Sequence, residues 1–191
     1  MDTRSDPNNE PRRPKPRVCF YHPNARGTGS ALRLEPHVAR KPGERCDGFF
    51  LEMAPQKTLS SREDGHGKPA TFDWEKKITV KLGFTDICEL LAVLEGKSEQ
   101  AGGKRDGLYH QNGRTNTLIR MAAHEAGGCA ISLSRKAAGE QEASRVGTVL
   151  SLPESLGLRH VLTFGILRTA FPVAPECDVN AFRPEPAGVS V

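Results

Sequence analysis

The sequence contains no long apolar run and no paired cysteine motif, and its first residues do not have the pattern expected of a secretion leader. No uninterrupted apolar stretch approaches the roughly 20 residues that span a bilayer. The first fifteen residues have no apolar core and mix acidic with basic side chains, unlike a signal or transit peptide. The five cysteines form no CxxC pair and are odd in number. We therefore expect a soluble, intracellular protein with reduced thiols and no association with a membrane.

A strong excess of one charge sign is also absent. The 27 Lys and Arg residues stand against 23 Asp and Glu, which gives a formal net charge of +4. This balance falls short of the composition of proteins that coat duplex DNA, although it allows a local basic strip. The sequence contains no phosphate-binding loop with its lysine, and Cys19 and His22 would face opposite sides of a strand. We expect no enzyme activity, no cofactor and no metal site.

Apolar residues make up 37% of the chain, fewer than in an average globular domain, and much of the polar bias lies at the two ends. Residues 1–16 cannot bury enough apolar surface to offset the entropy of ordering, which predicts a disordered arm. Residues 172–191 combine frequent proline with no apolar period, which predicts an irregular tail. Residues 17–171 are then expected to form one folded domain.

The first half of this domain has the pattern of four strands and a helix. The strands are predicted at Val18–His22, Ser30–Glu35, Gly48–Met53 and Trp74–Leu82, with a polar loop at 56–70. Alternation puts Trp74 on the apolar face of the last strand. The opposite, polar face of that strand carries Glu75, Lys77, Thr79 and Lys81. Thr85 is then predicted to cap a helix that runs to about Glu95 and stops at Gly96.

The second half repeats this pattern. Strands are predicted at Gly107–His110, Thr117–Ala122, Cys129–Ser134 and Gly147–Leu150. The segment Ser151-Leu152-Pro153-Glu154 is a capping-box signature for a longer helix that extends to about Ala170. Together the halves predict an α+β fold of two ββββα units, in which antiparallel sheets pack with helices. The sequence shows no residue-level repeat between the halves.

Four segments, in order, resemble the Whirly family of single-stranded DNA-binding proteins. They are Ala31–Pro36, Leu51–Pro55 followed by Phe72-Asp73-Trp74, Leu108-Tyr109-His110, and the apolar C-terminal helix. Gly27 and Gly29 stand where that family carries lysines, and the 56–70 loop is longer. The resemblance implies antiparallel sheets that radiate as blades from a hub of packed helices. It also implies a homotetramer, with single strands lying along the sheets and between subunits.

Binding single strands without sequence preference requires aromatic faces on which bases stack and cations that follow the backbone. Aromatic and cationic side chains are interleaved along the predicted strands. This pattern and the resemblance give the following candidate contacts: Tyr21, Arg26, Ser30, Phe50, Lys57, Phe72, Trp74, Lys77, Lys81, Tyr109, His110 and Arg120. We therefore expect a non-catalytic, homo-oligomeric single-stranded DNA-binding protein, located in the cytoplasm, where association with a nucleoid fits its predicted ligand.

Three alternatives stay open at this point. The first is a single-stranded RNA-binding or RNA-annealing module on the same fold, because contacts to the 2′-hydroxyl separate RNA from DNA and no sequence pattern reveals them. The second is a Mg²⁺-dependent nuclease built on Glu75-Lys76-Lys77 with Asp64 or Asp73. The third is an assembly protein whose helices oligomerise and whose sheets bind another protein.

Overall fold

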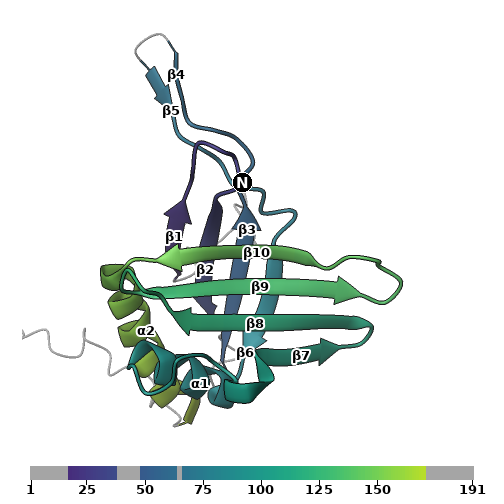
Figure 1. Cartoon of the computed structure of the whole chain (residues 1–191), viewed down its shortest axis with the longest axis vertical. Coiled ribbons are helices and arrows are strands. Elements are labelled where there is room, and N and C mark those ends of the chain that lie inside the picture. The colour runs from purple at the N-terminus through teal and green to yellow at the C-terminus, as the bar shows by residue number, and fades with distance from the viewer. Residues whose placement is uncertain (1–16, 38–47, 64–65, 171–191) are drawn as a thin grey trace, which may run out of the picture.

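The computed structural model describes residues 17–37, 48–63 and 66–170. The predicted arm at 1–16 and tail at 172–191 lie outside the described residues and stay predictions. The described part forms two four-stranded antiparallel sheets, each followed along the chain by a helix (Figure 1). This arrangement confirms the predicted α+β fold of two ββββα units.

The two sheets have the same kind of connectivity. The first sheet has the order β1-β2-β3-β6, and with its helix it consists of β1 Val18–His22, β2 Ser30–Pro36, β3 Phe49–Pro55, β6 Ile78–Leu82 and α1 Phe84–Leu94. The second sheet has the order β10-β9-β8-β7. Its elements are β7 Leu108–Asn112, β8 Thr115–Ala123, β9 Cys129–Ala137, β10 Ser144–Leu150 and α2 Leu152–Ala170. A short 3₁₀ turn, η1 Gly103–Arg105, precedes β7.

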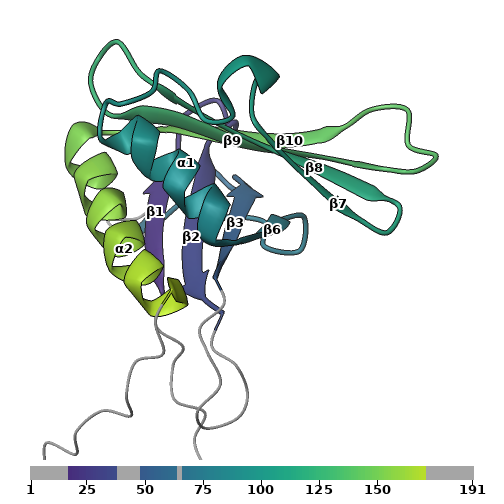
Figure 2. The same cartoon turned by 90° about the horizontal axis from the view of Figure 1, so that it is seen from below.

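The hydrophobic core lies between the sheets, whose strands cross at a steep angle in Figure 1. Alternation sends one row of side chains from every strand into this interior. Figure 2 shows α1 and α2 side by side at one end of the sheets, where their apolar residues complete the core. Fully buried side chains include Leu32, Leu51, Met53, Ile78, Ile87, Leu90, Ile119, Met121, Leu133 and Leu162. Burying each such side chain contributes about 1.5–3 kcal/mol, so this interior fixes how the sheets face outward.

Helix α2 begins where the sequence predicts and extends to Ala170, the last residue that the structure describes. Ser151 donates its backbone N–H and its hydroxyl to Glu154 Oε2, over 2.8 and 2.7 Å. The predicted capping box is therefore confirmed. The helix continues unbroken through Gly165, where the ring of Phe49 occupies the space that a Cβ would need.

Two boundaries in the first half differ from the prediction. Strand β6 starts at Ile78, because residues before it form a turn in which the Lys76 N–H donates to the Asp73 carbonyl over 3.2 Å. The placement of Trp74 on the apolar face of this strand was therefore wrong. Helix α1 starts before Thr85, with Gly83 as the cap residue, and the Gly83 N–H donates to Asp86 Oδ2 over 2.8 Å. Thr85 lies inside the helix, whereas Gly96 ends it as predicted, with a φ of 68°.

The 56–70 segment is more ordered than the predicted polar loop. It contains a small antiparallel hairpin of β4 Ser61–Glu63 and β5 His66–Lys68. In Figure 1 this hairpin projects beyond the end of the first sheet. Its strands are too short to show an alternating pattern, which is why the sequence did not predict them.

The two halves do share a residue-level pattern, which was missed when their sequences were compared with each other. The chain contains two tyrosines, and each precedes a histidine in the first strand of a sheet, at Tyr21-His22 and Tyr109-His110. Each histidine is paired across the ladder with a buried hydroxyl residue, and an arginine follows that residue three positions later: Ser30 and Arg33 in the first half, Thr117 and Arg120 in the second.

The two histidines connect the halves to each other. His22 Nε2 lies 3.1 Å from Glu154 Oε1, although the two groups are not aligned as a hydrogen bond. His110 Nε2 lies 3.1 Å from Asp86 Oδ1. Both carboxylates also accept the N–H of the residue that caps their helix. Each half therefore holds the start of the other half's helix.

Candidate nucleic-acid interface

The outer side of the first sheet brings together most of the predicted contact residues. We call this surface the first-sheet face. The register places Tyr21 beside Ala31 and Ala54, Arg33 beside Glu52, and Phe50 between Glu35 and Lys81. The side chains of these residues alternate with the buried rows, so they point away from the core. The segment 72–77 runs along one end of the same surface, where Phe72 forms a bridge to Gln56.

Aromatic rings lie at both ends of the first-sheet face. The Tyr21 side chain is 55% exposed, and its ring centroid lies 5.6 Å from that of Phe72, at an interplanar angle of 40°. Trp74 is half-buried beneath the Arg33 guanidinium, whose carbon lies 4.3 Å from the ring centroid. Phe50 contacts the His37 ring edge-on, with centroids 4.9 Å apart. The Phe50 position is roughly 13 Å along the sheet from that of Tyr21, which is several stacked bases of length.

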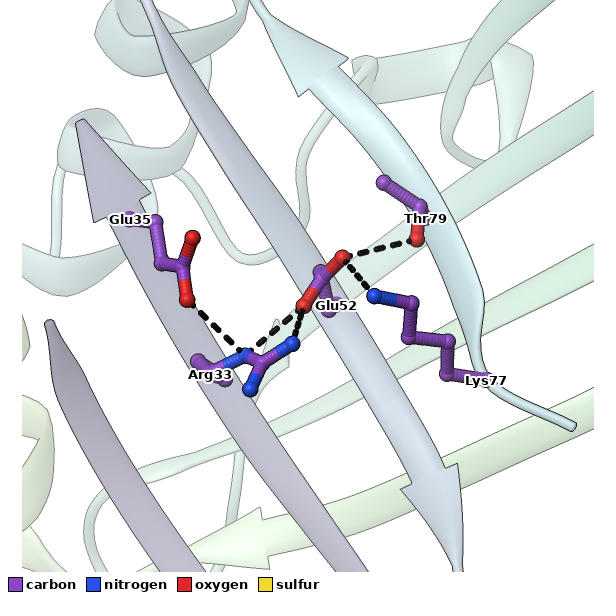
Figure 3. Close-up of polar contacts among 5 residues, drawn as sticks. All are labelled: Arg33, Glu35, Glu52, Lys77 and Thr79. Atoms are coloured by element: carbon purple, nitrogen blue, oxygen red, sulfur yellow. Dashed lines mark hydrogen bonds and ion pairs between the residues drawn. The ribbon is translucent and has the colours of Figure 1, made fainter. Parts of the chain in front are cut away.

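An acidic residue lies at the centre of this face (Figure 3). Glu52 Oε2 accepts from Arg33 Nε over 2.7 Å and also from Arg33 Nη2, and Glu52 Oε1 accepts from Lys77 Nζ over 2.6 Å and from Thr79 Oγ1 over 3.0 Å. Arg33 Nε also lies 3.3 Å from Glu35 Oε1. The Glu52 side chain is only 8% exposed.

The ionisation of Glu52 is controlled by this network. Burial by itself raises the pKa of the carboxyl, but the hydrogen bonds from Lys77, Arg33 and Thr79 outweigh it and bring the pKa below its ordinary value. Glu52 is therefore charged at neutral pH. It fixes Arg33 over the Trp74 ring and holds the Lys77 ammonium, so both cations have defined positions before any ligand arrives.

Gln56 joins two further cationic segments to this face. Its side-chain oxygen accepts from the N–H groups of Asn24 and Gly29, over 2.9 and 3.1 Å, and its nitrogen donates to the Asn24 carbonyl over 3.1 Å. The turn between β1 and β2 is thereby fastened to the end of β3. Exposed Arg26 and Lys57 consequently lie at the same end of the sheet as Tyr21 and Phe72.

The outer side of the second sheet, which we call the second-sheet face, carries two predicted contacts. Tyr109 is 66% exposed on β7, and its ladder partner is Leu118. Arg120 follows on β8 and donates to Asp106 Oδ2 through Nε and Nη2, over 3.1 and 2.9 Å. This hydrogen-bonded pair lowers the pKa of the Asp106 carboxyl and raises the pKa of Arg120. The guanidinium is thus held in one orientation against the sheet.

Two predicted contacts lie on neither face. Ser30 is buried, and its hydroxyl donates to the Gly147 carbonyl over 2.9 Å, which ties β2 to β10. His110 is half-buried against Asp86, as described above. Both occupy inward positions in their strands, where they hold the sheets and helices together.

Sequence reasoning missed Arg33, Glu52, Gln56 and Arg145. Alternation within β2 and β3 does place Arg33 and Glu52 on the side away from Leu32 and Leu51. Their mutual contact depends on the register between strands, which alternation within a single strand does not fix. Arg145 is exposed on the second-sheet face, and only the pairing of β9 with β10 places it there.

The nuclease triplet takes a different arrangement from the predicted one. Glu75 and Lys77 were expected on one face of a strand, but Glu75 lies in the turn before β6 and Lys77 is bound to Glu52. Asp64 lies outside the described residues. Among the residues that the structure describes, no three His, Cys, Asp or Glu side chains converge in a way that could hold a metal ion.

In the same part of the chain, no helix is long and apolar enough to cross a membrane.

Comparison with known proteins gives matches at the level of structure. No protein-family model and no curated protein sequence matches the chain. WHY1 from Arabidopsis thaliana superposes with a TM-score of 0.63 and 16% identity, over 84% of this chain and 88% of that chain. The plant transcriptional regulator PBF-2 gives 0.59 and 17%, over 91% and 99%. A guide-RNA-binding protein complex bound to a guide RNA gives 0.53 and 22%, over 82% and 94%. The structure of this chain therefore has the Whirly-like fold that the sequence motifs predicted.

Proposed function

We propose that this protein binds single-stranded nucleic acid, with single-stranded DNA as its ligand, little sequence preference and no catalysis. The observation that supports this most is the first-sheet face. There, the Tyr21–Phe72 pair and the Trp74 ring under Arg33 lie beside exposed Lys57. Stacking one base on one aromatic ring contributes about 1–3 kcal/mol and is tolerant of sequence, because every base has a flat face.

Cations near these rings supply the second half of the interaction. Phosphate contacts provide affinity and register but do not read bases. Arg33 and Lys77 are fixed by Glu52, while Arg26 and Lys57 are exposed at the same end of the sheet. Two structural neighbours are consistent with a nucleic-acid ligand: one is a transcriptional regulator and another is bound to a guide RNA.

The single tryptophan makes this proposal directly measurable. Trp74 is the only tryptophan of the chain and lies on the proposed binding surface. A base that stacks near its ring should quench its fluorescence on titration with single-stranded DNA. A matched duplex should quench less and bind more weakly by fluorescence anisotropy, because its bases are already stacked. Equal or tighter binding of the duplex would contradict the stacking model.

RNA is the second candidate ligand, and the guide-RNA-bound neighbour is the observation that favours it. The same anisotropy experiment with an RNA of matched sequence separates the two. A preference of tenfold or more for RNA would replace DNA by RNA in the proposal. Cleavage of either strand on addition of Mg²⁺ would instead support the nuclease alternative.

We also propose that the protein assembles into a homotetramer through its helices. Helix α2 exposes Leu152, Leu156 and Leu167, which lie on one side of the helix by their spacing. Light scattering at micromolar concentration should give four times the chain mass, and Leu156→Glu should reduce it. The exposed substitution Lys136→Ala on β9 is a control for a general effect of a surface substitution. A monomeric wild-type protein would refute the assembly.

A further inference from the structure

The second-sheet face contains a pocket of about 420 Å³ that the proposed stacking surface does not use. Its floor is the outer side of β8, β9 and β10, where Ala122 pairs with Ala130 and Ser132 pairs with Gly147. These residues are small while their neighbours are large, so the surface is hollow there. Pockets for small ligands typically measure about 300–1,000 Å³, and the size of this one fits a single compact ligand.

One wall of the pocket is a tightly folded loop, residues 100–107. A Cβ on Gly102 would overlap the Gly107 carbonyl, and a Cβ on Gly107 would lie 2.6 Å from the Ile119 carbonyl oxygen. Asp106 has a φ of 56°, the only left-handed non-glycine residue in the described part of the chain. Such conformations cost of order 1 kcal/mol and persist only where the surroundings hold them. The wall is therefore built rigidly against β8.

The charged groups of the lining are two arginines, Arg120 and Arg145, and the carboxylate of Asp106, whose pKa both arginines lower. Arg120 is oriented by Asp106, and Arg145 stands on the far side of the floor, where it is exposed. No ion pair among the described residues includes Arg145. Guanidinium groups bind phosphate through paired, charge-assisted hydrogen bonds. Ala122, Ala130 and Val149 form the next row of the floor, beyond the row of Arg120, Ser132 and Gly147, and offer an apolar surface there.

We propose that this pocket binds one nucleotide, with its base on the small-residue floor and its phosphate on Arg145. A free mononucleotide and one nucleotide of a bound strand share this chemistry. Binding of one nucleotide of a longer strand rests on the proposed function, and the neighbouring residues are arranged to suit it. Tyr109 stands in the same cross-strand row as Arg145, through Leu118 and Ser134, so a neighbouring base has a ring on which to stack.

The test uses the full-length protein and isothermal titration calorimetry with AMP, CMP, GMP, UMP, ribose 5-phosphate and inorganic phosphate. We expect the nucleotides to bind more tightly than the two ligands that lack a base. Ala130→Leu fills the pocket and should weaken nucleotide binding at least tenfold. Arg145→Glu lies on the surface, so it should leave folding intact and weaken binding about 10–100-fold. Lys136→Ala removes an exposed cation of the same face outside the pocket and should change nothing.

Strand binding is measured on the same variants by anisotropy with single-stranded DNA. If mononucleotides bind and Ala130→Leu abolishes this while oligonucleotides never bind, the pocket is a free-nucleotide site and the single-strand proposal fails. If Ala130→Leu weakens only the oligonucleotide, the pocket holds a nucleotide of the strand. Inorganic phosphate binding as tightly as AMP would overturn the nucleotide assignment. The assignment would also be overturned if Ala130→Leu and Arg145→Glu bound both mononucleotides and oligonucleotides as tightly as the wild-type protein. That outcome would leave the proposal of single-strand binding intact.

Discussion

The two sheets have one topology but present different outer surfaces. In both, a tyrosine on the first strand stands near an arginine on the second, as Tyr21 with Arg33 and Tyr109 with Arg120. On the first-sheet face, the arginine is held by a nearly buried carboxylate and covers an aromatic ring. On the second-sheet face, the carboxylate comes from an exposed loop, and the neighbouring positions are small.

This difference shows how one backbone plan can produce a flat surface and a hollow one. Where strands carry large outward side chains, as with Phe50 and Arg33, rings and cations cover the sheet. Where the equivalent rows hold alanine, serine and glycine, the sheet backbone itself is accessible and a pocket forms. The fold therefore sets which positions face outward, and the side-chain size at a few of them decides what kind of ligand each face suits.

The largest expected contrast is in stability, between the two carboxylates. Glu52→Gln leaves Arg33 and Lys77 without their shared negative partner in a mostly buried site, and should lower the free energy of unfolding by about 2 kcal/mol. Asp106→Asn removes an exposed partner of Arg120, which solvent screens, and should lower the free energy of unfolding by clearly less. Urea unfolding of both variants measures the difference. Equal losses would mean that the two networks are energetically alike.

The carboxylate of Glu52 also predicts that stability depends on pH. The pKa of Glu52 lies below its ordinary value of 4.5. A group of this kind stabilises the fold above its unfolded-state pKa, and this stabilisation is lost as the pH falls through the folded-state pKa. The wild-type protein should therefore lose stability as the pH is lowered from 4.5, and Glu52→Gln should lose less over the same interval. Parallel acid profiles in urea unfolding would contradict the assignment.

The next contrast is in affinity, between the two tyrosines. Tyr21→Ala removes one ring of a two-ring platform and should weaken single-strand binding about 5–150-fold, whereas Tyr109→Ala removes a single ring and should fall at the lower end of that range. Tyr21→Phe keeps the ring and serves as the control. Anisotropy measures all three. An unchanged affinity in Tyr109→Ala would limit strand binding to the first-sheet face.

A smaller contrast tests whether the two halves are equivalent. His22→Ala and His110→Ala each remove a contact to a helix-capping carboxylate, and each should lower the free energy of unfolding by about 1 kcal/mol. The exposed His160→Ala should have little effect. Thermal or urea unfolding of the three variants is sufficient. A large effect in only one of the first two would break the correspondence between the halves.

The smallest contrast lies within the first-sheet face, between two lysines. Neutralising one phosphate of a single strand contributes about 0.7 to the slope of log K against log salt. Lys57 is exposed, so Lys57→Ala should lower that slope by about this amount. Lys77→Ala should lower it by less, because Glu52 already holds its ammonium. Anisotropy over a series of salt concentrations measures both slopes.

Strand and helix patterns could be predicted from sequence, because alternation and capping residues act locally. Val18–His22 and the Ser151–Glu154 cap are examples. Trp74 was misplaced because period-two alternation continues by chance through the turn before β6. Ser30 was wrongly chosen as a contact residue. It lies two residues before Leu32 in the same strand, so alternation alone already predicts that it points inward. The Arg33–Glu52 contact and the pocket both depend on pairing between strands, which no single strand encodes.

His22 and His110, each of which contacts the helix of the other half, have a consequence for how the chain can be divided. A half cut out alone would contain the residues of its own sheet and helix, but its helix-capping carboxylate would lose the histidine that contacts it. Glu154 would be without His22, or Asp86 without His110. Two copies of such a half could restore both contacts only by swapping them across a twofold axis. A circular permutant that opens the connection between the halves should therefore fold, whereas either half alone should fold only by pairing with another copy.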